Sequence, residues 1–230
     1  ERIKLEPDFR LLKKFMNKTI LKKLEILKNK KNFSYLMELI LGIDDAGRGP
    51  VIGPMVLAGC LIKEETEKEL KRLGVRDSKQ LTQKRREFLE KIIKEKAIDF
   101  WIELMSPEQI DNRNGDGVNL NDLEALMASN IINKINKGSQ KIRVILDCPS
   151  PNRARWRDTV RIKVKNLSNL EIICEHKADV NHIAVSAASI LAKCERERQM
   201  DKLREVYGKE IGSGYSTDPL TKKFLEKNIK

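Results

Sequence analysis

The sequence is poor in the residue types that build thiol and imidazole metal sites. It contains four cysteines and two histidines in 230 residues, and no Cys-x-x-Cys pair. The cysteines lie far apart, at Cys60, Cys148, Cys174 and Cys194, so the spacing of a zinc finger is absent. Three of them stand in apolar or helical contexts, which favours buried, reduced thiols. Reduced thiols are typical of the cytosol or nucleus, and we expect a cytoplasmic protein.

Long apolar runs are also missing. The longest, residues 51–62, is interrupted by Gly53, Pro54 and Gly59 and is too short to span a bilayer. No segment has the pattern of a signal peptide. We therefore expect no membrane partner. We also expect a monomer.

Positive charge is what the sequence has in excess. Lys and Arg number 46 against 34 Asp and Glu, which gives a net charge of +12. A basic soluble chain commonly binds a polyanion, so nucleic acid is the first candidate partner. A membrane surface or simple solubility are the alternatives. Apolar residues make up 40% of the chain, enough for one domain of good size or for a domain with an extension.

Residues 1–38 differ from the rest of the chain. They contain 11 Lys or Arg against 5 Asp or Glu, a net +6 and half of the total excess. Apolar residues recur there at helical spacing: Phe9, Leu12, Met16, Ile20, Leu24 and Leu27. We predict a basic amphipathic helical extension over residues 1–38 and a main domain over residues 39–230. The extension could pack its apolar stripe on the main domain, contact nucleic acid or lie on a membrane surface.

The main domain has an α/β pattern. Apolar runs predict strands at residues 39–43, 51–62, 97–105, 142–147 and 170–175. Helices are predicted at residues 63–73, at 82–96 after Thr82 as N-cap, after Ser106 and Pro107, from Asn119 or Asn121 to about 135, from about 179 to 207, and after Thr217 as N-cap. A hairpin should join the first two strands. This order indicates one α/β domain around a central sheet.

Acidic residues follow three of the predicted strands. Asp44 and Asp45 end the first, Asp147 ends the fourth, and Asp179 comes soon after the fifth. Ligands of an open α/β sheet gather beyond the strand ends. Carboxylates that meet there would repel one another unless cations lay between them, and hard divalent ions such as Mg²⁺ prefer oxygen ligands. In a basic protein this pattern indicates phosphoryl transfer with two metal ions. Each aspartate alone could equally be a turn residue or a helix cap.

Three loops carry candidate phosphate or sugar contacts. Gly47 and Gly49 could bring backbone N–H groups close to a ligand, and Arg48 between them could grip a phosphate. Lys79 offers an ammonium group ahead of the Thr82 helix. Tyr215 lies between Gly214 and Ser216 and could stack on a sugar or base. A tight turn, a polar loop and a surface plug are the structural alternatives.

Six segments in order resemble the signatures of type 2 ribonucleases H. They are residues 42–54, 77–82, 119–124, 147–149, 176–179 together with 185–193, and 212–215 together with 218–219. The resemblance covers about residues 39–226. It implies the ribonuclease H-like fold, a central mixed sheet flanked by helices. It also implies an endoribonuclease that hydrolyses the RNA strand of RNA/DNA hybrids and cuts 5′ of ribonucleotides embedded in duplex DNA, leaving 3′-hydroxyl and 5′-phosphate ends.

The resemblance assigns roles to particular residues. The four acids of the family's two-metal site, which takes Mg²⁺ or Mn²⁺, map to Asp44, Asp45, Asp147 and Asp179. The Gly-Arg-Gly element that contacts the ribonucleotide maps to Gly47, Arg48 and Gly49, and the family's loop tyrosine maps to Tyr215. Arg48 and Lys79 would hold phosphates. The rival interpretation is a catalytically weak protein that binds RNA/DNA hybrids.

Two positions depart from the family pattern. Asp45 stands where the family has glutamate, so its carboxylate is one methylene shorter and lies about 1.5 Å back. Mg²⁺ tolerates little geometric slack, so rate or metal preference should differ. Ile183 stands where the family often has proline.

Overall fold

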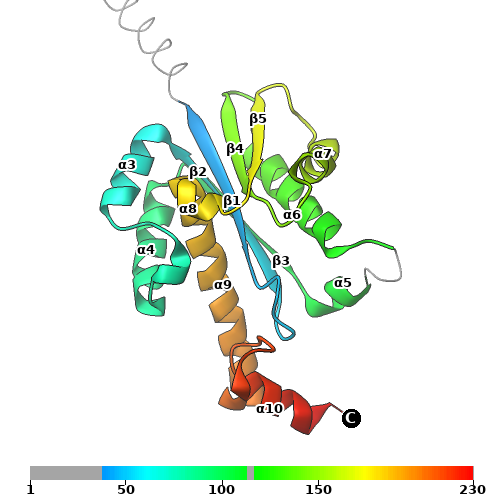
Figure 1. Cartoon of the computed structure of the whole chain (residues 1–230). Helices are drawn as coiled ribbons and strands as arrows, with labels where there is room; N and C mark the ends of the chain where they lie inside the picture. Colours follow the sequence, from blue (N-terminus) through cyan, green and yellow to red (C-terminus); the bar gives the residue numbers. More distant parts are fainter. Residues whose placement is uncertain (1–37, 113–116, 230) are drawn as a thin grey trace, which may run out of the picture. The chain divides into compact units, whose positions relative to one another are not determined.

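The computed structural model describes residues 38–112 and 117–229, so the predicted helix at the N-terminus lies outside the described residues. Within them, five strands form one mixed sheet in the order β3-β2-β1-β4-β5 (Figure 1). The strands are β1 (Leu39–Ala46), β2 (Met55–Lys63), β3 (Asp99–Met105), β4 (Ile142–Asp147) and β5 (Leu170–Glu175). The predicted α/β fold with a central mixed sheet is confirmed.

The pairing of the strands brings the carboxyl ends of three of them to the same side of the sheet. β1 runs antiparallel to β2 as the predicted hairpin, and β2 runs antiparallel to β3. β4 runs parallel to β1, and β5 runs parallel to β4. The carboxyl ends of β1, β4 and β5 therefore meet at the same edge, where the candidate acids stand.

Helices cover both faces of this sheet. They are α3 (Glu64–Arg72), α4 (Gln83–Lys96), α5 (Pro107–Asn112), α6 (Leu120–Ile135), α7 (Arg153–Lys163), α8 (Ala178–Asn181), α9 (Ile183–Tyr207) and α10 (Pro219–Asn228), with short 3₁₀ turns at Ser78–Gln80 and Lys209–Ile211. One buried cluster joins the sheet to α3, α4 and α9, and a second joins the opposite face to α6 and α7 (Figure 1). In the described part of the chain, no helix is both long and apolar enough to cross a membrane.

The alternation of β1 sends its two acids to opposite faces. Ile40 belongs to the cluster under α9, whereas Leu41 and Ile43 belong to the cluster under α6. Successive side chains of a strand point to opposite faces, so Asp44 faces α9 and Asp45 faces α6. The approach of α9 is close, because a Cβ at Gly42 would stand 2.1 Å from the carbonyl carbon of Ala184.

Two predicted elements have different bounds in the structure. The second strand begins at Met55 rather than at Val51, because Val51 and Ile52 donate their N–H groups to Gly214 O, at 2.8 and 3.2 Å, and so form part of a loop. The long helix is broken at His182, which has extended backbone angles, into α8 and α9.

The other differences concern a helix cap and a missed helix. The N-cap of α10 is Asp218, whose side chain accepts from Leu220 N, so Thr217 is not the cap. α7 was not expected from the sequence. Its buried side chains are Trp156 and Val160, spaced one helical turn apart among arginines. Two apolar residues are too few to reveal a helical period.

Candidate active site

The structure brings the four predicted acids to the sheet edge from three elements, β1, β4 and α8. Asp44 stands beside Asp147 because Ile43 and Leu146, one residue earlier in each strand, are partners in the parallel register. Asp179 lies in α8, after β5, with its residue only 2% exposed. The Oδ1 atom of Asp147 accepts a hydrogen bond from Ala178 N at 2.9 Å, which ties α8 to the end of β4.

Burial and mutual repulsion make the charged forms of Asp44, Asp45 and Asp147 unfavourable. The pKa of Asp44 is raised well above its usual value by burial first, and then by the charges of Asp45 and Asp147. Burial also raises the pKa of Asp45, with Arg48 acting in the opposite direction. Burial raises the pKa of Asp147, although the hydrogen bond from Ala178 favours its charged form. The charged forms of Asp44, Asp45 and Asp147 therefore need positive charge beside them.

Two lysines supply part of that positive charge. Lys79 Nζ lies 3.5 Å from Asp179 Oδ2, on a side chain that is 72% exposed. Burial lowers its pKa, but Asp179, Asp77 and Asp44 outweigh that effect and the pKa is raised. Lys193 of α9 donates to Ser78 Oγ, and burial lowers its pKa. Lys79 therefore lies beside the acids. The sequence had indicated only that it belongs to a loop that could bind phosphate.

A fifth carboxylate was not predicted as a site residue. Glu124 of α6 is 2% exposed, and its Oε2 accepts from Arg48 Nε at 2.8 Å. Arg48 also donates to Asn121 Oδ1, so its guanidinium is held between the turn after β1 and α6. Burial, followed by the charges of Asp45 and Asp44, raises the pKa of Glu124 to about 8 in spite of the ion pair. The ion pair and the raised pKa point in opposite directions, and burial decides because almost no water reaches this carboxylate.

Further residues join this network from segments that carried the family resemblance. Ser189 of α9 hydrogen-bonds to the carboxylate of Asp44, and its Oγ lies 2.7 Å from Ser78 Oγ. The only sequence signal that could have identified these residues is the family resemblance, whose segments contain them. Nothing in local periodicity separates Glu124, Ser189 or Lys193 from ordinary helix residues.

The predicted substrate-binding loops also meet. The turn after β1 has Gly47 at φ +90°, where a side chain would be strained. A Cβ at Gly49 would lie 3.9 Å from Tyr215 Cε1, so the tyrosine ring packs beside this turn. Tyr215 is 41% exposed and remains open to a ligand.

The donor chemistry of the edge fits a hard divalent cation. Its acids offer only oxygen atoms, which Mg²⁺ and Mn²⁺ prefer. The raised pKa values of Asp44, Asp45 and Asp147 show that their charged forms lack a balancing charge, which a cation would supply. In residues 38–112 and 117–229, however, no three carboxylate, imidazole or thiol groups are already gathered as a metal cage. A bound cation would have to draw the carboxylates together.

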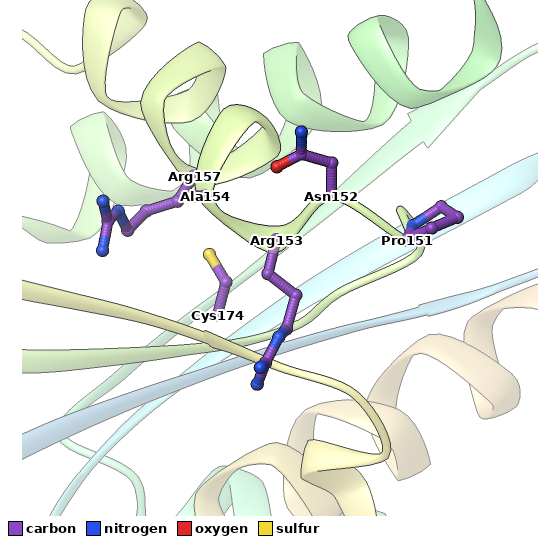
Figure 2. A pocket seen from close by; sticks show the side chains of 6 residues that line it. All are labelled: Pro151, Asn152, Arg153, Ala154, Arg157 and Cys174. Carbon is purple, nitrogen blue, oxygen red and sulfur yellow. The ribbon is translucent and has the colours of Figure 1, made fainter.

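A separate hollow lies at the start of α7. It is lined by Pro151, Asn152, Arg153, Ala154, Arg157 and Cys174 (Figure 2). None of the candidate acids lines it. The acid cluster is therefore distinct from this hollow.

Comparison with known proteins identifies relatives over most of the chain. The family model for ribonuclease HII matches residues 41–230. The ribonuclease HII of Methanocaldococcus jannaschii is 42% identical over 203 residues, which cover 84% of this chain and 86% of that protein. The crystal structure of the ribonuclease H2 from Pyrococcus horikoshii has a TM-score of 0.74 at 37% identity, covering 82% of this chain and 86% of that one. The ribonuclease HII of Archaeoglobus fulgidus, solved in complex with PCNA, has a TM-score of 0.71 at 36% identity, with coverages of 82% and 85%.

The mixed sheet, its acidic edge and these likenesses define an endonuclease of the ribonuclease H class, a hydrolase that acts on RNA. Within that class, the chain belongs to the ribonuclease HII family.

Proposed function

We propose that this protein is a divalent-metal-dependent endoribonuclease that recognises the junction between a ribonucleotide and DNA. It hydrolyses the RNA strand of RNA/DNA hybrids and cuts on the 5′ side of ribonucleotides embedded in duplex DNA. The products carry 3′-hydroxyl and 5′-phosphate ends. The observation that carries the proposal is the meeting of the acid edge with Lys79, while Gly49 and Tyr215 pack together at the turn that follows β1.

Each part of the site has a task in this reaction. Backbone groups of the Gly47–Gly49 turn bind the ribose 2′-hydroxyl, which is what distinguishes RNA from DNA. Tyr215 packs against the following sugar, where a deoxyribose leaves room for the ring. Lys79 and the basic surface hold phosphates on either side of the scissile bond. Arg48 is hydrogen-bonded to Glu124 and Asn121. We therefore expect it to position the turn as well as attract phosphate.

Asp44, Asp45, Asp147 and Asp179 would hold the metal ions, Mg²⁺ or Mn²⁺. When bound, such ions activate a water molecule and stabilise the leaving oxygen. The chain's own contribution is to hold these carboxylates on rigid elements. β1 and β4 fix Asp44 and Asp147 in neighbouring register, and the bond from Ala178 N fixes the orientation of Asp147.

The decisive test is cleavage of a duplex that contains one ribonucleotide. With Mg²⁺ or Mn²⁺ we expect a single cut 5′ of that nucleotide, no cut in the matched all-DNA duplex, and no cut in EDTA. Asp147→Asn removes a metal-binding charge from an incompletely buried side chain, so turnover should fall at least about a hundredfold while the fold survives. Binding of the duplex in Ca²⁺ should remain. Cleavage by Asp147→Asn at nearly the original rate in Mg²⁺ would contradict the assignment.

A hybrid-binding protein with weak turnover is the second candidate, and the short side chain of Asp45 favours it. In that case the duplex would bind in Ca²⁺ with the expected salt dependence, but neither metal would support more than trace cleavage. Restoring the glutamate would then be the direct way to recover activity.

A further inference from the structure

Arg196 of α9 is a buried arginine without an assigned role. Its residue is only 6% exposed, whereas arginines are rarely buried to this extent unless they are paired. No carboxylate pairs with it among the described residues. Its Nη2 atom instead donates to two main-chain oxygens, Ile52 O at 3.1 Å and Ser213 O at 3.3 Å.

These two carbonyls belong to the two substrate-binding loops. Ile52 lies in the loop that follows the Gly47–Gly49 turn, and Ser213 lies two residues before Tyr215. The loops are also joined directly, because Val51 N and Ile52 N donate to Gly214 O. Arg196 therefore spans both sides of one junction in the main chain.

The guanidinium also touches the recognition residues themselves. Its central carbon lies 5.3 Å from the centroid of the Tyr215 ring, which is within the range of a cation–π contact. A Cβ at Gly47 would stand 2.6 Å from Arg196 Nε, and one at Gly214 would stand 3.1 Å from Nη2. The backbone of both loops thus lies directly on this one side chain.

Stability alone does not explain an arginine here. Its Nε is buried and makes no hydrogen bond within residues 38–112 and 117–229. A buried donor without a partner opposes folding, and burial also lowers the pKa of this guanidinium. The fixed, planar set of donors has a different use, because it can hold two carbonyls and an aromatic ring in one arrangement.

We propose that Arg196 is a positioning residue for specificity. It sets the spacing between the Gly47–Gly49 turn and the Tyr215 ring, and so decides how well the protein distinguishes a single embedded ribonucleotide from continuous RNA. It acts through these loops and does not touch the substrate. The inference rests on the proposed function, in which the turn reads the 2′-hydroxyl and Tyr215 packs on the next sugar.

The test compares kcat/KM on two substrates, a DNA duplex with one ribonucleotide and a continuous RNA/DNA hybrid. Arg196→Gln should lower kcat/KM on the single-ribonucleotide duplex about tenfold, within the range for losing an aromatic nucleic-acid contact. The loss on the hybrid should be smaller, because Tyr215 fits poorly there. Arg196→Lys keeps the charge over the ring but cannot reproduce the fork of donors. It should therefore retain only part of the preference for the single-ribonucleotide duplex over the hybrid.

A matched control comes from the same helix. Arg198 is also bonded to acceptors, but these are the carboxylates of Glu90 and Glu195, away from both loops. Arg198→Gln should lower the melting temperature and leave the ratio of the two kcat/KM values unchanged. A general loss of stability would move both substrates alike, whereas a positioning role moves their ratio.

Combining Arg196→Gln with Tyr215→Ala separates this inference from the function on which it rests. If Arg196 acts through the tyrosine, its effect on the ratio should largely vanish once Tyr215 is alanine. If Tyr215→Ala changes the ratio of the two kcat/KM values but neither Arg196 variant does, only the role of Arg196 is overturned. Full additivity of the two substitutions would overturn it as well. A ratio that Tyr215→Ala itself does not change would remove the proposed reading by Tyr215, and this inference with it. If Arg196→Gln does not fold, Arg196→Lys carries the same comparison.

Discussion

Asp45 stands where the resemblance to type 2 ribonucleases H implies a glutamate. It points toward α6, its charge is opposed by burial, and Arg48 is the principal group that favours its ionised form. Its carboxylate lies about 1.5 Å short of where a glutamate would reach. The side chain therefore suits a metal ion that accepts variable coordination geometry better than one that requires nearly ideal geometry.

We predict that Asp45→Glu raises the rate supported by Mg²⁺ by about two- to tenfold, up to roughly 1.4 kcal/mol of activation free energy. In the unmodified protein Mn²⁺ should support a faster rate than Mg²⁺, because Mg²⁺ requires more nearly ideal geometry. Single-turnover rates in both metals, on one ribonucleotide-containing duplex, would measure this. Equal rates in the two metals together with a slower glutamate variant would show that the backbone has already adapted to aspartate.

Glu124 shows what local sequence could and could not reveal about the site. The four aspartates were predictable because each stands at or near the end of an apolar run. Glu124 instead lies inside a helix, where a glutamate is usually solvated, and only its burial and the bond from Arg48 mark it. Its participation depends on how α6 packs against β1, and no local pattern encodes that packing.

The raised pKa of Glu124 predicts a pH-dependent stability. The pKa rises from 4.5 to about 8 on folding, so the folded state binds this proton more tightly than the unfolded state. The stabilisation is complete below pH 4.5 and is lost as the pH rises toward 8, at up to about 1.4 kcal/mol per pH unit. In EDTA, Glu124→Gln should therefore flatten the fall in unfolding free energy between pH 5 and 8.

Urea unfolding at several pH values measures that slope. The exposed Glu226→Gln serves as control and should leave the slope as it is. Asp44, Asp45 and Asp147 also have raised pKa values, so Glu124→Gln should reduce the slope without abolishing it. Identical slopes for the unmodified protein and Glu124→Gln would mean that Arg48 keeps the carboxylate charged.

The bounds of elements that consist mainly of apolar residues were predictable from the sequence. The bounds that depend on tertiary contacts were not. β4 and β5 have their predicted bounds because apolar residues dominate each strand, with only Arg143 and Glu171 between them. The break between α8 and α9 depends on contacts made elsewhere. At the break, His182 Nε2 lies 2.8 Å from Glu175 Oε2, and Ala184 N donates to Glu67 Oε1 at 3.3 Å. Helical periodicity continues across this break, so the sequence alone indicates one helix.

The attachment of α10 to the Tyr215 loop gives a prediction for an element. The buried hydroxyl of Thr221 donates to Ile211 O at 2.8 Å and accepts from Gly214 N at 3.0 Å. Thr221→Val keeps the shape but leaves both main-chain groups without this partner, and each buried unpaired group costs about 1–3 kcal/mol. We expect a clear fall in the urea midpoint and weaker cleavage of the single-ribonucleotide duplex.

Thr217→Val is the matched comparison for that change. Thr217 is exposed, and Asp218 rather than Thr217 caps α10, so this substitution should change the unfolding free energy by less than about 0.5 kcal/mol. A loss at Thr217 as large as the loss at Thr221 would mean that the buried hydroxyl of Thr221 is not what holds the loop.

For the whole molecule, the distribution of charge decides how it meets a nucleic acid. Half of the net charge of +12 belongs to residues 1–38. Each phosphate contact releases counterions, so its loss lowers the slope of log affinity against log salt by about one. We predict that deleting residues 1–36 weakens binding of an RNA/DNA duplex and flattens this slope, measured in Ca²⁺ so that no cleavage occurs.

Charge and packing make separable contributions to that result. Replacing Lys13, Lys14 and Lys18 by Gln removes three charges and keeps the apolar stripe. If these residues contact phosphates, the slope should fall by up to about three, with little change in melting temperature. If the stripe packs on the main domain instead, the deletion should lower the melting temperature while the glutamine variant keeps both slope and stability. An unchanged slope in both variants would contradict the nucleic-acid contact, and duplex affinity would then rest on the charges of residues 39–230 alone.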